Sequence, residues 1–264
     1  MGFEYITSKS NDKIKRVSLL IRSASERKKQ GVFVLEGLRL CNDAFLNGIV
    51  SDELYFTQEV YDKYTQDIDN LIKNTKKAYC VTKDVISKIS DTNSSQGVIQ
   101  VIDVCNVSNK VTVDIKGRYI ACENVSDPSN LGAIARTAEA LGLSGLVLID
   151  HCCDVYNPKA MRASMGSLLR LPIIYFDDIA DLYNCCLDNQ MRLIASVVHG
   201  DSIEIKSFEF KDGDIIIIGN EANGMSDKAI SLCNEKITID IKGRAESFNA
   251  AVAASIIMWE LSSR

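Results

Sequence analysis

The chain has few of the residues that build metal sites and disulfide frameworks. Its 264 residues include only two histidines, and its nine cysteines contain no pair at CxxC spacing. Cys152-Cys153 and Cys185-Cys186 are directly adjacent, which suits neither tetrahedral zinc nor a set of disulfides. The sequence therefore predicts no metal site, and it predicts reduced thiols, which are typical of the cytoplasm.

Long apolar runs are also absent. No stretch reaches the ~18 apolar residues that cross a bilayer, and the first residues lack the apolar segment of a signal peptide. We therefore expect a cytoplasmic protein with no membrane partner. Apolar residues still make up 46% of the chain, which is enough to fill the cores of one or two domains.

Acidic residues outnumber basic ones, which argues against a general positive coat for nucleic acid. The net charge is −5, but it is unevenly distributed. Residues 1 to 110 hold 16 Lys and Arg against 14 Asp and Glu, whereas residues 111 to 264 hold 14 against 21. If the chain binds a polyanion, the first half should therefore make much of the contact.

Residues 1 to 106 have the pattern of a small α/β domain. Apolar runs predict strands at residues 32–35, 53–57, 78–81 and 97–104, with helices at 13–22, 38–46, 60–73 and 83–89. Arg27, Lys28 and Lys29 fall in what we expect to be a polar loop. This basic run fits a solvated loop as well as it fits contacts with RNA phosphates.

Residues 107 to 116 are polar and aperiodic, and we expect a linker there. From residue 117 to 264, about six strands alternate with helices, which predicts a mostly parallel sheet with helices on both faces. Four isoleucines from Ile215 to Ile218 are typical of a buried strand. The last helix is apolar and is expected to open at Glu246-Ser247.

Three polar clusters stand out in this second domain. They are Asn124, Asp127, Asn130, Gly132 and Arg136; then the loop from Gly219 to Gly224 with Glu221; then Ser247 and Asn249. Polar loops at the carboxyl ends of parallel strands bind ligands, and a helix N-terminus favours phosphate. Each cluster could equally be a turn or a helix cap. The second lacks the GxGxxG and GxxxxGK[ST] patterns, which argues against an NAD enzyme.

Taken together, the clusters resemble the three motifs of the SpoU (TrmH) branch of the SPOUT RNA methyltransferases. The first motif, N-x-x-D-P-x-N-x-G-x-x-x-R, is matched at Asn124, Asp127, Pro128, Asn130, Gly132 and Arg136. The second, G-x-E-x-x-G-[LM], is matched at Gly219, Glu221, Gly224 and Met225. The third, S-L-N-V-S-V-A, is matched at Ser247, Asn249, Val252 and Ala253. Phe248, Ala250 and Ala251 replace its other residues, so its second serine is missing.

The resemblance covers residues 117 to 264 and implies an α/β knot that binds S-adenosylmethionine. Residues 1 to 106 resemble the ribosomal-protein-like substrate-binding domain of the members that act on ribosomal RNA. By position, the cofactor contacts implied are Gly219, Ile239 and Phe248. The catalytic residues implied are Arg136, Asn130, Glu221, Ser247 and Asn249. Family members are homodimers through the C-terminal domain, with the active site completed across the interface.

The implied reaction is methyl transfer from S-adenosylmethionine to a ribose 2′-hydroxyl of RNA, most plausibly of large-subunit ribosomal RNA. A guanidinium hardly deprotonates, so we expect Arg136 to hold a phosphate and the developing oxyanion rather than act as the base. Asn130 would orient Arg136, and Glu221 would accept a hydrogen bond from Arg136 or from a hydroxyl. Ser247 and Asn249 would position the ribose or the donor.

Several alternatives stay open at this point. The chain could be a catalytically silent RNA-binding protein, because a fold does not guarantee an activity. Transfer RNA could be the substrate, or a base rather than a ribose could be methylated. An NAD enzyme on an ordinary doubly wound sheet is disfavoured by the missing fingerprint.

Overall fold

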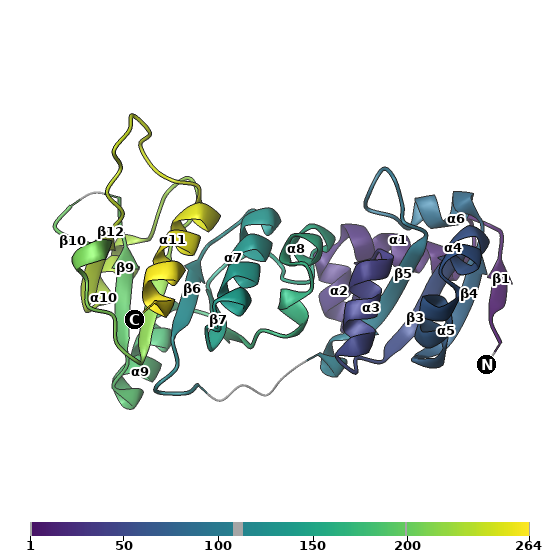
Figure 1. Ribbon diagram of the computed structural model, residues 1–264, viewed down its shortest axis with the longest axis horizontal. Helices are drawn as coiled ribbons and strands as arrows, with labels where there is room; N and C mark the ends of the chain where they lie inside the picture. Colours follow the sequence, from purple (N-terminus) through teal and green to yellow (C-terminus); the bar gives the residue numbers. More distant parts are fainter. Residues whose placement is uncertain (1, 108–112, 199, 264) are drawn as a thin grey trace. The chain divides into compact units, whose positions relative to one another are not determined.

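The computed structural model describes residues 2–107, 113–198 and 200–263. The chain divides into two compact units (Figure 1). Unit 1 is Met1–Ser108 with Tyr156–Arg170, and unit 2 is Asn109–Val155 with Leu171–Arg264. Of the linker expected at residues 107 to 116, residues 108 to 112 lie outside the described residues. No helix in the described ranges is long and apolar enough to cross a membrane.

Unit 1 is built on a five-stranded sheet. In spatial order its strands are β1 (Glu4–Ile6), β4 (Thr75–Val81), β3 (Ser51–Thr57), β5 (Val98–Asp103) and β2 (Val32–Glu36). β4 is parallel to β1 and β3, whereas β5 is antiparallel to β3 and β2. The helices are α1 (Asp12–Arg22), α2 (Ala24–Gln30), α3 (Leu38–Leu46), α4 (Gln58–Lys63), α5 (Thr65–Lys73) and α6 (Lys83–Lys88), followed by the 3-10 turn η1 (Val104–Asn106). The predicted α/β character of this region is confirmed.

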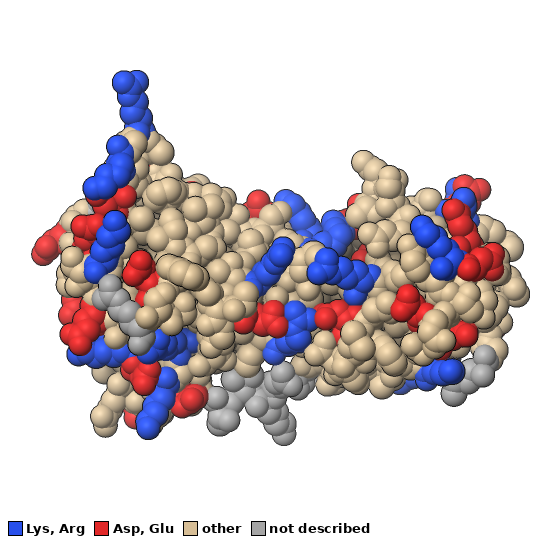
Figure 2. Space-filling model, in the orientation of Figure 1, with Lys and Arg blue, Asp and Glu red and all other residues tan. Residues whose placement is uncertain are grey.

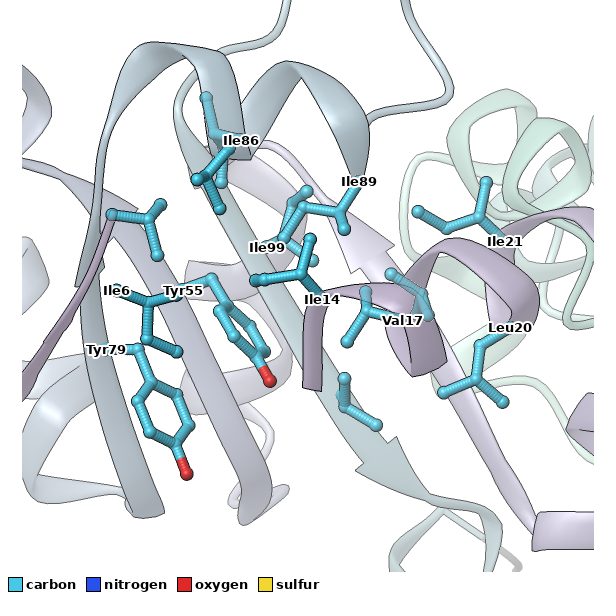
Figure 3. Packing of buried hydrophobic residues seen from close by; sticks show 14 of the residues in the cluster. Ile6, Ile14, Val17, Leu20, Ile21, Tyr55, Tyr79, Ile86, Ile89 and Ile99 are labelled. Carbon is cyan, nitrogen blue, oxygen red and sulfur yellow. The ribbon is translucent and has the colours of Figure 1, made fainter. Parts of the chain in front are cut away.

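The core of unit 1 follows from the alternation of side chains along its strands. Every second residue faces α1 and α6, and Figure 3 shows Tyr55, Tyr79 and Ile99 of the sheet packed beside Ile14 and Val17 of α1. The rings of Tyr55 and Tyr79 stack with centroids 5.0 Å apart. Helices α3 and α5 contact the strands and each other. Each buried aliphatic side chain stabilises such a core by about 1.5–3 kcal/mol.

A segment from the second half of the sequence belongs to unit 1. Residues Tyr156–Arg170 form α8 (Pro158–Ser164) and the 3-10 turn η2 (Ser167–Leu169), and α8 contacts β2. Tyr156 stacks on Phe33, with ring centroids 4.6 Å apart. Arg162 donates to Asp91 at 2.6 Å, and Arg170 pairs with Asp43. These contacts explain why the segment groups with unit 1, although sequence placed it within residues 117 to 264.

Unit 2 is a seven-stranded sheet in which all strand pairs are parallel. In spatial order its strands are β10 (Ile203–Glu204), β12 (Glu235–Thr238), β9 (Arg192–Ser196), β11 (Asp214–Ile218), β6 (Tyr119–Glu123), β7 (Gly145–Ile149) and β8 (Ile173–Phe176). Its helices are α7 (Pro128–Ala140), α9 (Ile179–Asn189), α10 (Asp227–Leu232) and α11 (Ala250–Ser262), with the 3-10 turn η3 (Ile205–Ser207).

The helices of unit 2 cover both faces of its sheet, as the sequence predicts. Helices α7 and α11 pack together and touch β7 and β11, whereas α9 and α10 pack together and touch β9. Alternate residues of each strand serve the two faces, so the isoleucine run in β11 is buried on both sides. The arrangement is an open, doubly covered parallel sheet.

Two expectations about local structure are wrong. The last helix begins at Ala250, because Asn249 caps it, and so Ser247 lies outside the helix. Arg27, Lys28 and Lys29 lie on α2 rather than in a loop. Ser23 ends α1, and its side chain accepts from Glu26 N to open α2 at once, which leaves no room for a loop.

Candidate active site

The candidate site lies where β6 and β11 end side by side. Cys122 of β6 is paired with Ile218 of β11, so the loops that follow the two strands leave the sheet at the same edge. The chain continues from β6 to β7 on one side, whereas the other neighbour of β11 is β9. The order of the strands reverses between β6 and β11, and ligands of open α/β sheets bind at such a point.

The first loop runs from Asn124 to Asp127 and is held in a tight turn. Asn124 has a left-handed backbone, with φ of 55°. Asp127 caps α7 by accepting from Ser129 N at 2.8 Å, and Pro128 occupies the first turn of that helix, where a missing N–H costs little. The side chain of Asn220, from the second loop, donates to Asn124 O at 2.8 Å and ties the two loops together.

Glu221 joins the second loop to the first through four hydrogen bonds. Its Oε2 accepts from the backbone N and the Oγ of Ser126, both at 3.2 Å. Its Oε1 accepts from Asp127 N at 3.1 Å and from Asn130 Nδ2 at 2.9 Å. The carboxylate therefore fixes the loop that leads into α7, together with the first turn of that helix.

Asn130 connects this pair of loops to the start of α11. Its Oδ1 accepts from Asn249 Nδ2 at 3.0 Å. Asn249 Oδ1 in turn accepts from Ala251 N at 3.0 Å and from Val252 N at 3.3 Å. The hydrogen bonds run unbroken from Asn249 through Asn130 and Glu221 to Ser126. Three segments far apart in sequence are thus brought together at Asn130, Glu221 and Asn249.

The ionisation of Glu221 follows from these contacts. Burial on its own would raise the pKa of this carboxyl, but the hydrogen bonds from Asn130 and from the backbone of Ser126 and Asp127 outweigh it and hold the pKa below its ordinary value. Glu221 is therefore an anion at neutral pH with its lone pairs engaged. Such a group orients its neighbours well and is a poor general base.

Arg136 does not join this cluster within one chain. It is exposed, and the described residues give it no hydrogen bond or ion pair. Six residues along a helix correspond to a rotation of about 240°, so Arg136 and Asn130 face different directions on α7. The expectation that Asn130 orients Arg136 is therefore wrong for a single chain. Of the two donors expected for Glu221, Arg136 or a hydroxyl, the structure shows a hydroxyl, that of Ser126.

Arg136 instead lines a shallow apolar groove of about 490 Å³ between α7 and α11. The other residues of the groove are Thr137, Ala140, Leu141, Ser255, Ile256 and Trp259. Trp259 is 62% exposed. An exposed indole beside an exposed guanidinium is unusual on a free surface and is typical of an interface.

The residues expected to contact S-adenosylmethionine lie in the second loop and in the segment between β12 and α11. At Gly219 a Cβ atom would come within 2.2 Å of the backbone at Gly224 and Met225, so only glycine allows the loop to fold back on itself. Ile239 and Phe248 border a loop that projects from unit 2 (Figure 1). Phe248 is 40% exposed, and Ser247 is exposed with no hydrogen bond to described residues.

This loop fits a ligand that is held through main-chain groups. Across residues 240 to 248 the structure records no backbone hydrogen bond to any described residue, so the N–H and C=O groups there are available. Lys242 and Arg244 on the loop are exposed, and Figure 2 shows basic side chains at its end. In the described part of the chain, no group of His, Cys, Asp and Glu side chains could hold a metal ion.

The three basic residues expected to bind RNA in unit 1 differ in their environment. Arg27 is buried, and its Nη1 donates to Leu20 O at 2.6 Å and Ile21 O at 3.1 Å at the end of α1. Its guanidinium therefore stabilises the junction of α1 and α2. Lys28 and Lys29 are exposed on α2, and Lys29 lies 3.8 Å from Glu26.

Two residues that organise the site were given no role in it from the sequence, although Asn220 belongs to the second polar cluster. Ser126 supplies two of the four donors to Glu221, and Asn220 both ties the loops together and shapes its own turn by accepting from Ala222 N and Asn223 N. Serine and asparagine are common in any turn, so their type gave no signal. The hydrogen bonds that give these two residues their role are made to a loop some 95 residues away in the chain.

Comparison with known proteins agrees with this geometry. The chain matches the SpoU rRNA Methylase family over residues 117–259 and the MRM3-like substrate binding domain over residues 11–100. It is 27% identical to the 23S rRNA (guanosine(2553)-2'-O)-methyltransferase RlmP of Bacillus subtilis, over 97% of this chain and 98% of the relative. It is 26% identical to the 23S rRNA (uridine(2479)-2'-O)-methyltransferase of Streptomyces viridochromogenes, over 97% and 90%.

A solved structure extends the likeness to the whole chain. The crystal structure of the SpoU methyltransferase AviRb from Streptomyces viridochromogenes, in complex with the cofactor AdoMet, superposes with a TM-score of 0.86 at 25% identity, covering 96% of this chain and 97% of that one. Fold and site together define an S-adenosylmethionine-dependent RNA methyltransferase. The chain belongs to the SpoU rRNA Methylase family, and the predicted class of enzyme is confirmed.

Proposed function

We propose that this enzyme transfers the methyl group of S-adenosylmethionine to a ribose 2′-hydroxyl of large-subunit ribosomal RNA. The observation that carries the proposal is the run of hydrogen bonds from Asn249 through Asn130 and Glu221 to Ser126. It unites the three sequence motifs at the carboxyl ends of β6 and β11. The names of the two relatives matched over 97% of the chain support ribosomal RNA as the substrate.

The cofactor supplies an activated methyl group on a sulfonium, so the chain's task is to hold both reactants in line. We assign the main chain at Gly219, Ile239 and Phe248 to the cofactor. The tight turn at Gly219 and the uncommitted backbone of residues 240 to 248 support this assignment. We also propose that the C-terminal segment is threaded as the trefoil knot of this family, which would keep the loop before α11 in place.

As the new C–O bond forms, the bond between the methyl group and the sulfonium sulfur breaks, and the proton of the acceptor hydroxyl passes to solvent water, because the oxygens of Glu221 are engaged. We assign Arg136 to the RNA phosphate beside that ribose and to the oxyanion that develops, because its five N–H donors stay charged at any physiological pH. Glu221 orients Asn130 and the first turn of α7. We assign Asn249, the cap of α11, and Ser247, just before it, to the ribose or the donor.

The position of Arg136 supports an active site shared between two copies of the chain. The groove it lines contains Trp259 and Ile256 and would be covered in a homodimer formed through α7 and α11. In such a dimer Arg136 of each chain would reach the partner's Glu221 cluster, a contact that Arg136 does not make within one chain. Exposed aromatic residues and arginine are enriched at the centres of protein interfaces.

Two inactive variants test this arrangement when they are mixed. Arg136→Ala removes the phosphate and oxyanion contact, and Gly219→Ala removes the cofactor site. If each active site takes Arg136 from one chain and the cofactor from the other, half of the randomly mixed dimers regain one complete site, and activity returns to roughly one quarter of the wild-type value. No recovery, in a mixture shown to exchange subunits, would place Arg136 and the cofactor in the same chain.

The location of the protein is part of the same proposal. All nine cysteines are free, and those at positions 41, 80, 122 and 186 are buried. Unpaired thiols fit a reducing compartment, so we assign the enzyme to the cytoplasm.

A further inference from the structure

Unit 1 contains a pocket of about 480 Å³ that the catalytic scheme does not use. It lies between α4, α6 and the loop that joins α6 to β5, which projects from unit 1 beside α6 (Figure 1). Its lining combines apolar, aromatic, basic and amide side chains. The residues are Leu38, Thr57, Glu59, Val60, Lys63, Tyr64, Lys83, Ile86, Ser87, Ser95, Gln96 and Gly97.

A buried carboxylate anchors the start of the loop that forms one wall of this pocket. Glu36, whose side chain is 5% exposed, accepts from Asp91 N at 2.8 Å and from Thr92 Oγ1 at 2.5 Å, and it also binds the hydroxyl of Ser90. Further along, a Cβ at Gly97 would come within 2.5 Å of Val60. Glycine thus lets the loop lie directly against α4. The loop is thus anchored at both of its ends.

The chemistry of the lining suits one nucleotide. The ring of Tyr64 is 39% exposed, and Lys63 Nζ lies 5.1 Å from its centroid. The side-chain amide of Gln96 makes no hydrogen bond with described residues, and its oxygen lies above the backbone of Gly37. An aromatic face stacks on a base, a free amide reads its edge, and a lysine meets a phosphate.

We propose that this pocket binds an unpaired nucleotide of the RNA substrate and so anchors it on unit 1. Tyr64 stacks on the base, Gln96 bonds to its Watson–Crick edge, and Lys63 contacts the adjoining phosphate. Lys83 contributes little charge because it is paired with Glu59. A paired base would hide the edge that Gln96 reads, so the occupant is single-stranded. The inference rests on the proposed function only in taking RNA as the substrate.

Fluorescence anisotropy of the full chain with labelled RNA tests the proposal. The probes are a mixed-sequence single strand about twelve nucleotides long, within the range that single-strand-binding domains cover, and the same RNA as a duplex. Tyr64→Ala should weaken binding of the single strand by about 5- to 150-fold, which corresponds to the loss of one stacked base. Tyr64→Phe should bind as the wild type does. Tyr5→Ala, which removes a 68%-exposed tyrosine outside the pocket, is the matched control.

The outcomes separate this inference from the proposed function. Equal single-strand affinity for Tyr64→Ala and Tyr5→Ala would overturn it, as would an equal loss of duplex and single-strand binding in Tyr64→Ala. Calorimetry should show unchanged binding of S-adenosylmethionine by Tyr64→Ala, because the residues assigned to the cofactor are in unit 2. The same measurement verifies that the variant is folded. If the enzyme methylates RNA but Tyr64→Ala leaves its affinity for the single strand unchanged, the pocket proposal alone is refuted. If the single strand binds selectively and this binding depends on Tyr64, but no RNA is methylated, the proposed function alone is refuted.

Discussion

Replacing Glu221 with glutamine would keep the shape of the side chain and remove its charge. The carboxylate accepts four hydrogen bonds, two on each oxygen. An amide offers one oxygen and one NH₂ group, so one pair of donors would face another donor. The hydroxyl of Ser126 can rotate to accept, but the backbone N of Ser126 cannot. The variant should therefore loosen the loop before α7.

The size of the effect follows from the bonds lost. A hydrogen bond to a charged acceptor contributes about 1.5–3 kcal/mol when buried, but Glu221 is exposed enough for water to replace part of it. We expect Glu221→Gln to lower the free energy of unfolding by about 1–2 kcal/mol. In a domain of this size, this corresponds to a fall in Tm of about 2–8 °C.

The stability that Glu221 contributes should depend on pH. Because the folded pKa of Glu221 lies below its ordinary value of 4.5, its stabilising contribution is present above about pH 4.5 and is lost as the pH falls through the folded pKa. The glutamine variant has no such contribution at any pH. The stability gap between wild type and variant should therefore be largest at neutral pH and should shrink in acid.

Urea unfolding at pH 7 and at lower pH would measure this gap. Glu209→Gln is the control, because Glu209 is an exposed glutamate of unit 2 whose side chain makes no recorded contact with described residues. In addition, Asn130→Ala should couple to Glu221→Gln by about 0.5–3 kcal/mol in a double-mutant cycle. A gap that stays constant with pH, or that equals the Glu209→Gln value, would refute the role given to the carboxylate.

Three further outcomes are expected. Asn249→Ala removes the cap of α11 and should lower the free energy of unfolding in urea by about 1–2 kcal/mol. Asn249→Asp keeps the cap and loses only the donor to Asn130, so equal stability of the two variants would contradict the capping role. Gly219→Ala should abolish binding of S-adenosylmethionine in calorimetry, while Gly2→Ala, in unit 1 and with open space around its Cα, should bind normally. Trp259→Glu should sediment as a monomer in sedimentation velocity. Leu187→Glu, at a 56%-exposed position on α9, should remain a dimer, and dimers of both variants would place the interface elsewhere.

Residue patterns alone predicted the architecture of both units well. The apolar runs of the strands and the alternation with helices are local signals, and the parallel sheet of unit 2 follows from them. The resemblance to the SpoU motifs implied that Asn130, Glu221 and Asn249 serve one site, and the structure joins their side chains by hydrogen bonds. Each of these residues lies at a fixed offset from a strand end or a helix start, so the fold carries it to the common edge.

Other features could not be read from the sequence because they depend on distant partners. The basic run at Arg27 has the composition of a loop, yet a single capping serine lets α2 follow α1 directly. The direction of Arg136 is set by helix geometry, and the described residues of the chain give its side chain no hydrogen bond or ion pair. The segment Tyr156–Arg170 joins unit 1 through pairs such as Arg170 with Asp43, which are 127 residues apart.

Mapping of ribose methylation tests the central claim most directly. Large-subunit ribosomal RNA transcripts, incubated with S-adenosylmethionine and the purified enzyme, would be hydrolysed by alkali, which leaves a 2′-O-methylated linkage intact. The wild type should protect a linkage that Arg136→Ala leaves unprotected, and Arg136→Lys should be strongly impaired because it keeps the charge but loses the planar fork. A folded wild type that binds the cofactor yet protects no linkage, or a methyl group found on a base, would contradict the account.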